Sequence, residues 1–547
     1  MPSDLSELPT RPRDAALTVA LLAVIASITG IGNRFAYDDV ALIATNDRVH
    51  SLQAFWQRFA EPYWPETFAH TLYRPITTLG FAFQWTAGAG SPFVFHLVSI
   101  LLYAACAVGV LLLARQILWP TAAWFAAALF AVHPVHVEAV ANVVGQAELV
   151  ATGAIVFAAW WYLRARRSGA LSARDVGVVA LLYAIGLLAK EGAIVLPALL
   201  VAAELTVIRR VSAQRSIRLA AWVPTLIALA CVAIALLFVR RAVIGSWLGD
   251  FPIPALENLS STERVLTMLA ASREWIRLLI WPSLLSFSYS PPYLDIVKAP
   301  ALSMVYGVVL IVGVVMAVVT TQRRAPAIAF GALWFAIAIL PVSNLFFVSG
   351  VFIAERTLFA PSVGFVFVVA GVLELLWPRV KSAEARRALT IAMGVVLFAG
   401  ALRSMLRQRA WFDTAHITTA GVRDLPDAYT VDALYGEDLA TRRAYGTAEK
   451  WLRRSIALFG TDPEVHVELA NLYVSNNQWA AAESTFNQAL AIDPKLSSAR
   501  AGLVLCLVHA KNYVDARKQA EIGVASGESV ETFTRLVAAI DSAAKMP

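Results

Sequence analysis

The sequence predicts an all-α membrane protein, in which a bundle of about eleven spanning helices is followed by a helical repeat domain. The 547 residues are 59% hydrophobic and 15% charged, whereas soluble domains carry about 25% charged residues. Eleven apolar runs approach the ~20 residues that a helix needs to cross the hydrocarbon core. After Arg409 the composition becomes that of a soluble helical domain, in which small and aromatic residues recur at a fixed interval.

The apolar runs are joined by short connections and by two long loops. They cover residues 15–33, 92–114, 119–133, 138–163, 175–189, 191–208, 218–239, 300–320, 326–346, 356–377 and 387–405. The long loops cover 34–91 and 241–299. The second contains an amphipathic stretch from Ser261 to Ile280 that carries Arg273 and Arg277 on one face. We expect this stretch to form an interfacial helix.

Basic residues mark alternate connections between the runs. The connections at 164–174, 209–218, 322–324 and 378–387 are rich in Arg or Lys and nearly free of acid, as the positive-inside rule requires of cytoplasmic loops. The net charge of +7 therefore reflects topology and does not indicate nucleic acid binding. The pattern predicts an integral membrane protein with a cytoplasmic N-terminus and an external C-terminal region. Arg403, Arg407 and Arg409 depart from it.

Charged and polar residues converge on the predicted external side. Asp38 and Asp39 follow the first run; His133, His136 and Glu138 join the third and fourth; Lys190 and Glu191 join the fifth and sixth; Glu355 and Arg356 open the tenth. Polar residues from 341 to 347 also interrupt an apolar region, which favours the wall of a cavity. Ionisable groups near lipid are rare without a function, so these positions predict one polar site.

Asp38 and Asp39 are the candidates for a general base. Two adjacent carboxylates raise one pKa toward a value suited to abstracting a proton. The alternative is a carboxylate pair that caps a helix or a loop. The sequence does not decide which of the two aspartates would act.

The other polar pairs also allow two interpretations. His133 and His136 share a helical face, but no third metal ligand follows at a recognised spacing, so hydrogen-bonding roles are favoured. Lys190 either forms an ion pair between helices or joins Arg356 in binding a lipid phosphate. No cofactor is predicted, and dependence on a divalent metal is left open.

The C-terminal region contains an internal repeat. Tyr445, Trp479 and Tyr513 are spaced by 34 residues, and so are Ala448, Ala482 and Ala516. This period is typical of tetratricopeptide helix pairs. We expect about three repeats over 411–547, with junctions near Pro463 and Pro494, after a membrane domain over 1–410. A concave solenoid surface of this kind would bind a protein or peptide.

The order of the motifs resembles that of the transmembrane and tetratricopeptide-repeat O-mannosyltransferases, glycosyltransferases of the GT-C superfamily. The motifs are YDD at 37–39, YRP at 73–75, HPVHVEAV at 133–140, KEGAIVLP at 190–197, WIRLLIWPSLLSFSYS at 275–290, SNLFF at 343–347 and ERTLFAPSVGF at 355–365. The resemblance covers nearly the whole chain. It implies a GT-C-type bundle and a bacterial relative, in the inner membrane with its site and repeats in the periplasm.

The resemblance also implies an activity and roles for residues. The sugar, mannose, would pass from a polyprenyl-phosphate carrier to hydroxyl groups of extracytoplasmic proteins, with inversion and without a metal. Asp38 or Asp39 would be the base, and Lys190 and Arg356 would bind the donor phosphate. The other candidates for binding substrate are Arg74, His133, His136, Glu138, Glu191, Arg273 and Glu355.

Two alternatives stay open at the level of sequence. A GT-C enzyme that acts on a lipid or glycan acceptor would use the repeats for assembly. A non-enzymatic membrane scaffold would use them to bind proteins, and its charged residues would only hold helices together.

Overall fold

The computed structural model describes residues 11–65, 72–208, 222–247, 253–527 and 530–543. The chain divides into two compact units: one within 1–252, 259–285 and 297–417, and one within 253–258, 286–296 and 418–547. Two short segments of the second long loop therefore belong to the C-terminal unit. Apart from an isolated β-bridge between Pro292 and Ala428, the regular structure of the described residues is helical, which confirms the all-α class.

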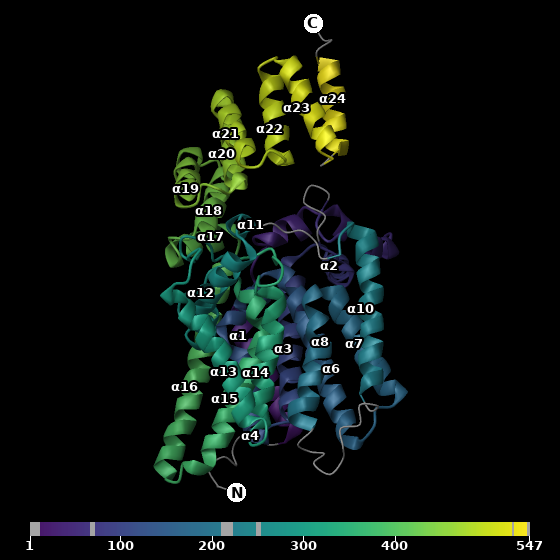
Figure 1. Cartoon of the computed structure of the whole chain (residues 1–547), viewed down its shortest axis with the longest axis vertical. Helices are drawn as coiled ribbons and strands as arrows, with labels where there is room; N and C mark the ends of the chain where they lie inside the picture. Colours follow the sequence, from purple (N-terminus) through teal and green to yellow (C-terminus); the bar gives the residue numbers. More distant parts are fainter. Residues whose placement is uncertain (1–10, 66–71, 209–221, 248–252, 528–529, 544–547) are drawn as a thin grey trace. The chain divides into compact units, whose positions relative to one another are not determined.

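The first unit is a bundle of helices that run side by side (Figure 1). Its main helices are α1 (Pro12–Ser27), α2 (Pro75–Gly88), α3 (Pro92–Ala114), α4 (Pro120–Val132), α5 (Val137–Ala141), α6 (Gln146–Ser168), α7 (Ala173–Ala189), α8 (Leu196–Ala203), α10 (Val223–Ile244), α12 (Ser261–Ile280), α13 (Val305–Thr321), α14 (Pro326–Ile339), α15 (Phe359–Leu376) and α16 (Ala383–Gln408). The amphipathic stretch predicted over 261–280 is α12.

The predicted spans correspond to helices, but fewer of them are long enough to cross a membrane. Within the described ranges, eight helices meet the length and hydropathy of a span, and a ninth is added if α4 and Pro134–Ala141, bent by 48°, form one broken span. Of the other two runs, 175–189 falls in the 17-residue α7 and 326–346 in an apolar helix over Pro326–Val342. The chain is an integral membrane protein with eight or nine candidate spans instead of eleven. The arginine-rich connection at 209–218 lies outside the described residues.

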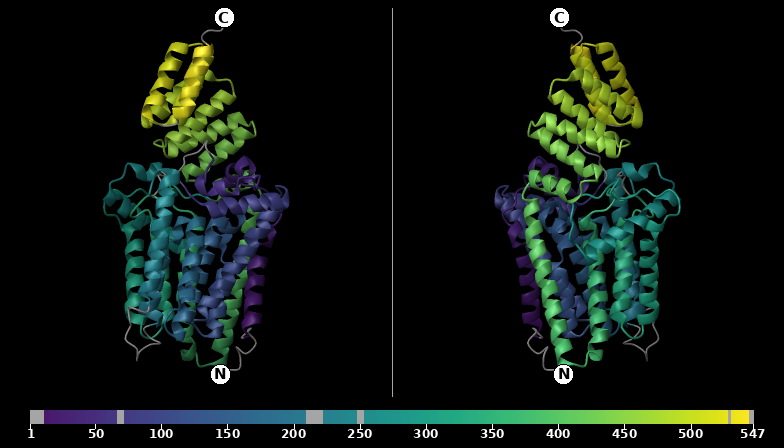
Figure 2. Two further views of the ribbon diagram at one scale, coloured as in Figure 1. Left: turned by 90° about the vertical axis from the view of Figure 1, so that its right-hand side faces the viewer. Right: turned by 90° about the vertical axis from the view of Figure 1, so that its left-hand side faces the viewer.

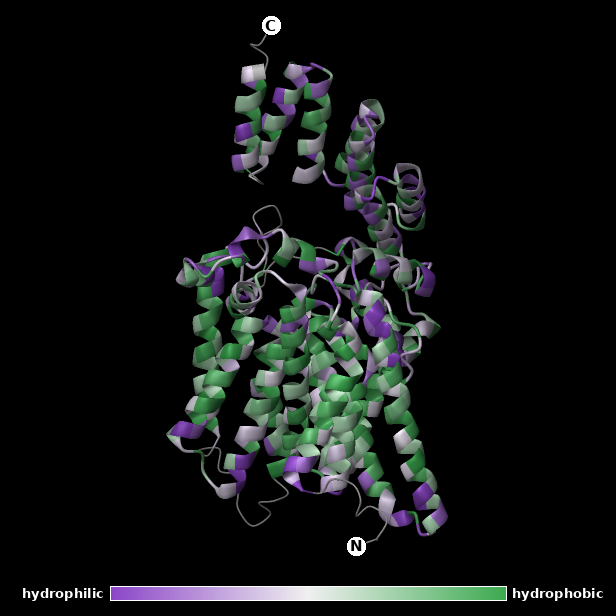
Figure 3. Cartoon of the chain, turned by 180° about the vertical axis from the view of Figure 1, so that it is seen from behind, coloured by the Kyte–Doolittle hydropathy of each residue, from purple (hydrophilic) through white to green (hydrophobic). Residues whose placement is uncertain are grey.

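The outer helices expose apolar surface of the kind that lipid covers in a membrane protein. Of the 18 most apolar consecutive residues in the span that contains α13, 6% are buried. In the span that contains α6, the corresponding share is 83%. Figure 3 shows the helices of the bundle apolar along most of their length and polar at their ends. The bundle therefore packs around α6 and presents helices such as α13 and α10 to the membrane.

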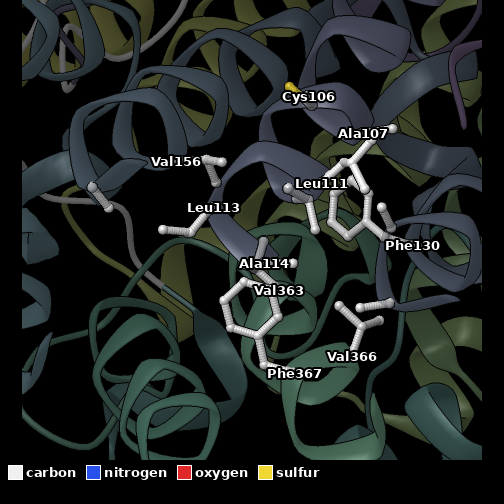
Figure 4. Close-up of a cluster of buried hydrophobic side chains, with 14 of the residues drawn as sticks. Cys106, Ala107, Leu111, Leu113, Ala114, Phe130, Val156, Val363, Val366 and Phe367 are labelled. Carbon is white, nitrogen blue, oxygen red and sulfur yellow. The ribbon is translucent and has the colours of Figure 1, made fainter. Parts of the chain in front are cut away.

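The core of the bundle is formed by α3, α4, α6 and α15. Figure 4 shows Leu111, Phe130, Val156 and Phe367, one from each helix, among the packed apolar side chains. Small residues allow α14 and α15 to approach closely: a Cβ atom on Gly331 would lie 2.6 Å from the carbonyl oxygen of Gly364. Such contacts are typical of membrane helices, which gain stability from close packing.

The second unit consists of helix pairs (Figure 2). They are α18 (Tyr429–Thr441) with α19 (Tyr445–Leu458), α20 (Pro463–Ser475) with α21 (Trp479–Ile492), and α22 (Ser497–His509) with α23 (Tyr513–Ser526), followed by α24 (Val530–Ala543). The aromatic residue of the 34-residue period begins the second helix of each pair. The turn before it has positive φ at Arg443, Asn477 and Lys511, again at intervals of 34, and Ala448, Ala482 and Ala516 are completely buried.

Candidate functional site

A cavity of about 570 Å³ opens in the first unit and is lined by charged residues that the sequence places far apart. The charged side chains come from the segment after α1, the start of α2, α6, the connection between α7 and α8, α10 and the segment before α15. They are Asp38, Arg74, Glu148, Lys190, Glu191, Arg240 and Arg356. Five of the candidate site residues therefore lie in one cavity: Asp38, Arg74, Lys190, Glu191 and Arg356.

Asp38 faces this cavity. The preceding residue, Tyr37, has a φ of 56°, which is uncommon for a residue other than glycine, and its N–H donates to Thr414 Oγ1 at 3.1 Å. The Asp38 Oδ2 atom lies 3.4 Å from Arg356 Nη1. Burial raises the pKa of Asp38, and the charges of Arg356 and Arg74 oppose that rise. Asp38 is thus a carboxyl group in a cavity, adjacent to cations.

Asp39 has a different environment. It is fully buried, it does not line the cavity, and its carboxylate accepts backbone N–H groups from Ala36, Val143 and Val144 at 3.4, 3.2 and 2.9 Å. Burial raises the pKa of Asp39 to about 7, while these hydrogen bonds act in the opposite direction. Asp39 therefore ties the segment after α1 to the turn that begins α6.

Arg356 is positioned by Glu138. The guanidinium Nη1 lies 2.9 Å from Glu138 Oε1, and the backbone N–H of Arg356 donates to Oε2 at 2.8 Å. Glu138 has no exposed surface and lies behind the cavity. A buried carboxylate that accepts both the backbone and the side chain fixes the arginine in one orientation.

Two more cations of the cavity, Arg74 and Lys190, also have acidic partners. Arg74 donates Nε and Nη2 to the two carboxylate oxygens of Glu191, at 3.0 and 2.6 Å, and stacks over Tyr63 at 5.1 Å from the ring centroid. Lys190 forms an ion pair with Glu148. Of the two interpretations of Lys190, the structure shows the ion pair between helices. Lys190 nevertheless lines the cavity.

Besides Asp39 and Glu138, four predicted site residues lie outside the lining of the cavity. His133 Nε2 contacts the Leu279 carbonyl oxygen at 2.9 Å, and His136 lies between Tyr103 Oη at 3.0 Å and Ser362 Oγ at 2.8 Å. Glu355 is buried, and Arg273 lies within α12. Among the described residues, no group of three or more His, Cys, Asp or Glu side chains is arranged to hold a metal ion. The two histidines thus have protein partners that tie α5 and its flanking turn to neighbouring helices.

Several lining residues were not anticipated from the sequence. They include Tyr63, Trp64, Arg240 and Trp247. Tyr63 and Trp64 lie in a long loop without periodicity, and Arg240 resembles an ordinary basic residue near the end of a span, so no sequence signal separated them from other residues. The segment 341–347, which the sequence analysis assigned to a cavity wall, contributes Pro341, Val342 and Phe347.

Comparison with known proteins identifies the repeats and the relatives of the chain. The tetratricopeptide repeat family matches residues 439–495, which confirms the prediction made from the 34-residue period. The Caenorhabditis elegans protein O-mannosyl-transferase F38B6.6 is 26% identical over 447 residues, 79% of this chain and 61% of that protein. The human protein O-mannosyl-transferase TMTC3 is 23% identical over 84% of this chain and 53% of its own length. A shorter match, to Drosophila melanogaster protein O-mannosyl-transferase Tmtc2, is 35% identical over 49% of this chain and 29% of that protein.

Among solved structures, an oligosaccharyltransferase of Archaeoglobus fulgidus aligns with a TM-score of 0.45 and 13% identity, over 82% of this chain and 59% of the archaeal one. The chain spans 53–61% of the length of the first curated relatives that it matches. The resemblance predicted from the ordered motifs is confirmed: over most of its length the chain is similar to protein O-mannosyl-transferases of the TMTC family.

Proposed function

We propose that the chain is a membrane glycosyltransferase of the GT-C type, which transfers a sugar from a polyprenyl-phosphate carrier to hydroxyl groups of extracytoplasmic proteins. The observation that carries this proposal is the cavity in which Asp38 lies beside several cations and an apolar wall. The names of the relatives, protein O-mannosyl-transferases, support mannose as the sugar and protein as the acceptor.

Asp38 is the proposed general base. Its carboxylate faces the cavity, whereas the oxygens of Asp39 accept backbone N–H groups. A base must reach the proton that it removes, and only one of the two aspartates meets this requirement. Asp38 would deprotonate the acceptor hydroxyl, whose oxygen would then attack the anomeric carbon as the bond to the carrier phosphate breaks. A single displacement of this kind inverts the anomeric configuration.

The cations of the cavity are the proposed binding site for the donor phosphate. Arg356, Arg74, Lys190 and Arg240 all line it, and guanidinium groups match the geometry of phosphate oxygens. Negative charge accumulates on the phosphate as it leaves, and fixed cations lower the energy of that state. Glu138 and Glu191 would hold Arg356 and Arg74 in place for this task.

An apolar wall of the same cavity would accept the polyprenyl chain. Leu187 and Leu188 of α7 and Ala233, Leu236 and Leu237 of α10 form this wall. In the most apolar window of the α10 span, only 11% of the residues are buried, so α10 faces the surrounding lipid. A polyprenyl chain could therefore remain in the membrane beside α10 while its phosphate reaches Arg356. We further propose that the N-terminus is cytoplasmic and that the site and the repeats are periplasmic, in a bacterial inner membrane.

Transfer to different acceptors tests the proposed function. Full-length protein in detergent would be supplied with radiolabelled polyprenyl-phosphate mannose and, separately, with an extracytoplasmic protein fraction, a glycan mixture or a lipid extract. Label in protein that alkaline β-elimination releases is the expected result. Label that moves only to glycan or lipid would identify the alternative acceptor class. Label that stays on the carrier with every acceptor, and with other sugars on the carrier, would favour a scaffold.

A further inference from the structure

A second cavity, of about 550 Å³, lies at the other end of the helix bundle from the candidate site. Gln146, at the start of α6, hydrogen-bonds to Phe95 O and Ser99 Oγ near the start of α3, both at 3.1 Å. These helices therefore begin together, on the side where Glu148 lines the candidate site. Each has 23 residues, or about 35 Å at 1.5 Å per residue. The second cavity is lined by residues at or beyond their far ends, namely Arg167 in the last turn of α6 and Arg115 to Trp119 after α3.

Four arginines line this second cavity, and they come from four different parts of the chain. Arg115 follows α3, Arg167 is in the last turn of α6, Arg324 follows α13 and Arg379 follows α15. Among the described residues that line the cavity, Glu374 is the one acidic residue, so the formal net charge of the four arginines and this glutamate is +3. Like charges repel one another when they converge, and an anion in the cavity would offset this repulsion.

Three hydrogen bonds with backbone groups involve these side chains. Glu374 accepts the backbone N–H of Trp119 at 3.1 Å. Arg167 donates to the carbonyl oxygen of Gln116, and Arg379 donates to that of Leu375 at 2.5 Å. Carbonyl groups at helix ends favour nearby cations, but they carry no net charge. The carbonyl contacts of Arg167 and Arg379 therefore leave the formal charge of the lining unchanged.

The surroundings of the cavity are those of a membrane interface. Trp119, which lines it, is 52% exposed, and tryptophan is enriched where hydrocarbon meets head groups. Ile117, Leu118 and Leu375 also belong to the lining. A ligand that combines an anionic phosphate with an apolar body would match both the arginines and this apolar surface.

We propose that this arginine cavity binds the phosphate group of an anionic glycerophospholipid, from the leaflet opposite to the candidate active site. One guanidinium group can donate two hydrogen bonds to two oxygens of the same phosphate. Basic pockets between membrane helices are suited to anionic lipid head groups. The headgroup phosphate would lie among Arg115, Arg324 and Arg379, with the first carbons of the acyl chains against Trp119. This proposal is independent of the glycosyltransferase activity, because it uses none of the residues of that site.

Native mass spectrometry of the full-length protein tests the proposal. Protein in detergent would be titrated with phosphatidylglycerol or phosphatidylcholine, which share a phosphodiester but differ in net charge. We expect a retained phosphatidylglycerol adduct that exceeds the phosphatidylcholine adduct. The double variant Arg324→Gln/Arg379→Gln should weaken phosphatidylglycerol binding by about tenfold or more, since each basic residue near an anionic surface contributes to attraction.

A matched double variant, Arg323→Gln/Arg387→Gln, removes the same charge from exposed positions outside the cavity and should leave binding unchanged. Arg324→Lys/Arg379→Lys keeps the charge and should retain most of the binding, even if the glutamine variant folds poorly. Equal losses in the cavity and control variants, or no preference for phosphatidylglycerol, would overturn the proposal. Displacement of the lipid by millimolar inorganic phosphate would assign the cavity to a soluble phosphate and exclude the lipid as its occupant.

Discussion

Arg356 contacts two carboxylates through one nitrogen: its Nη1 atom lies 2.9 Å from Glu138 Oε1 and 3.4 Å from Asp38 Oδ2. The shorter contact is to the fully buried residue, and Glu138 also accepts the backbone N–H of Arg356. The longer contact is to the residue that faces the cavity. This geometry makes Glu138 the residue that holds Arg356, and it supports the proposal that Asp38 exchanges its contact with Arg356 for one with substrate.

The first prediction separates these two relationships by mutation. Arg356→Gln should lower kcat for sugar transfer by about 10²–10³, the usual effect of removing one group that stabilises developing charge. Glu138→Gln keeps an acceptor for the backbone N–H of Arg356 and should cost about 10–100-fold, as losses of supporting residues do at metal sites. Glu384→Gln, at an exposed position in the first turn of α16, serves as control. Full activity of Arg356→Gln would contradict the proposed role.

The second prediction concerns stability at Asp39. Asp39→Ala would leave the N–H groups of Val143 and Val144 without their acceptor, which costs about 1–3 kcal/mol for each buried group left unsatisfied. The Tm of the purified protein in detergent should therefore fall by several degrees. Asp38→Ala removes no backbone acceptor and should change Tm much less. Equal losses of Tm would show that the two aspartates do not have separate roles.

The third prediction is a pH dependence of stability that comes from Asp39. Its pKa is about 7 in the folded chain and 3.8 in the reference state. Between these values the folded state binds more protons than the unfolded state, so stability decreases as pH rises from about 4 to about 7 and is then constant. Thermal unfolding measured across this range should show that slope, and Asp39→Asn should reduce it. An unchanged slope in Asp39→Asn would assign the pH dependence to other groups.

The fourth prediction tests the close approach of α14 and α15. Gly331→Ala would place a Cβ atom 2.6 Å from the Gly364 carbonyl oxygen, so the two helices must move apart, at a cost of about 1–3 kcal/mol by analogy with overpacked cores. Gly394→Ala in α16 meets no atom within 4 Å and should be neutral or slightly stabilising, since alanine favours helix. A lower Tm for Gly331→Ala than for Gly394→Ala is expected, and the reverse order would contradict the helix contact.

Periodic features of the fold could be predicted from the sequence. The 34-residue spacing of Tyr445, Trp479 and Tyr513 predicted the tetratricopeptide repeats, and in the structure these residues begin α19, α21 and α23. The amphipathic helix predicted over 261–280 is α12, which has the same bounds and begins with a capping box formed by Ser260 and Glu263. The span count was less accurate, because hydropathy does not distinguish a crossing helix from a short apolar helix such as α14.

The site was predictable only in part. Because ionisable side chains near lipid are costly unless they have a function, Asp38, Lys190 and Arg356 were candidates. These three residues line one cavity. The separation of Asp38 from Asp39 could not be predicted, because it depends on the turn at Val143–Gly145 supplying N–H groups to one of two adjacent carboxylates. Likewise, His133 and His136 are polar residues near the site in sequence, but their partners come from α12, α3 and α15, which only the fold brings together.

The most direct test of the central proposal, that Asp38 is the base, is single-turnover transfer of radiolabelled mannose from polyprenyl-phosphate mannose to protein acceptor by wild type, Asp38→Asn and Asp39→Asn. Asp38→Asn should bind the donor with unchanged Kd and lose transfer by at least about 10²-fold, in the range of a missing general base. Asp39→Asn should retain transfer at temperatures where it stays folded. Transfer that survives in folded Asp38→Asn, with loss in folded Asp39→Asn, would contradict the assignment of Asp38 as the base.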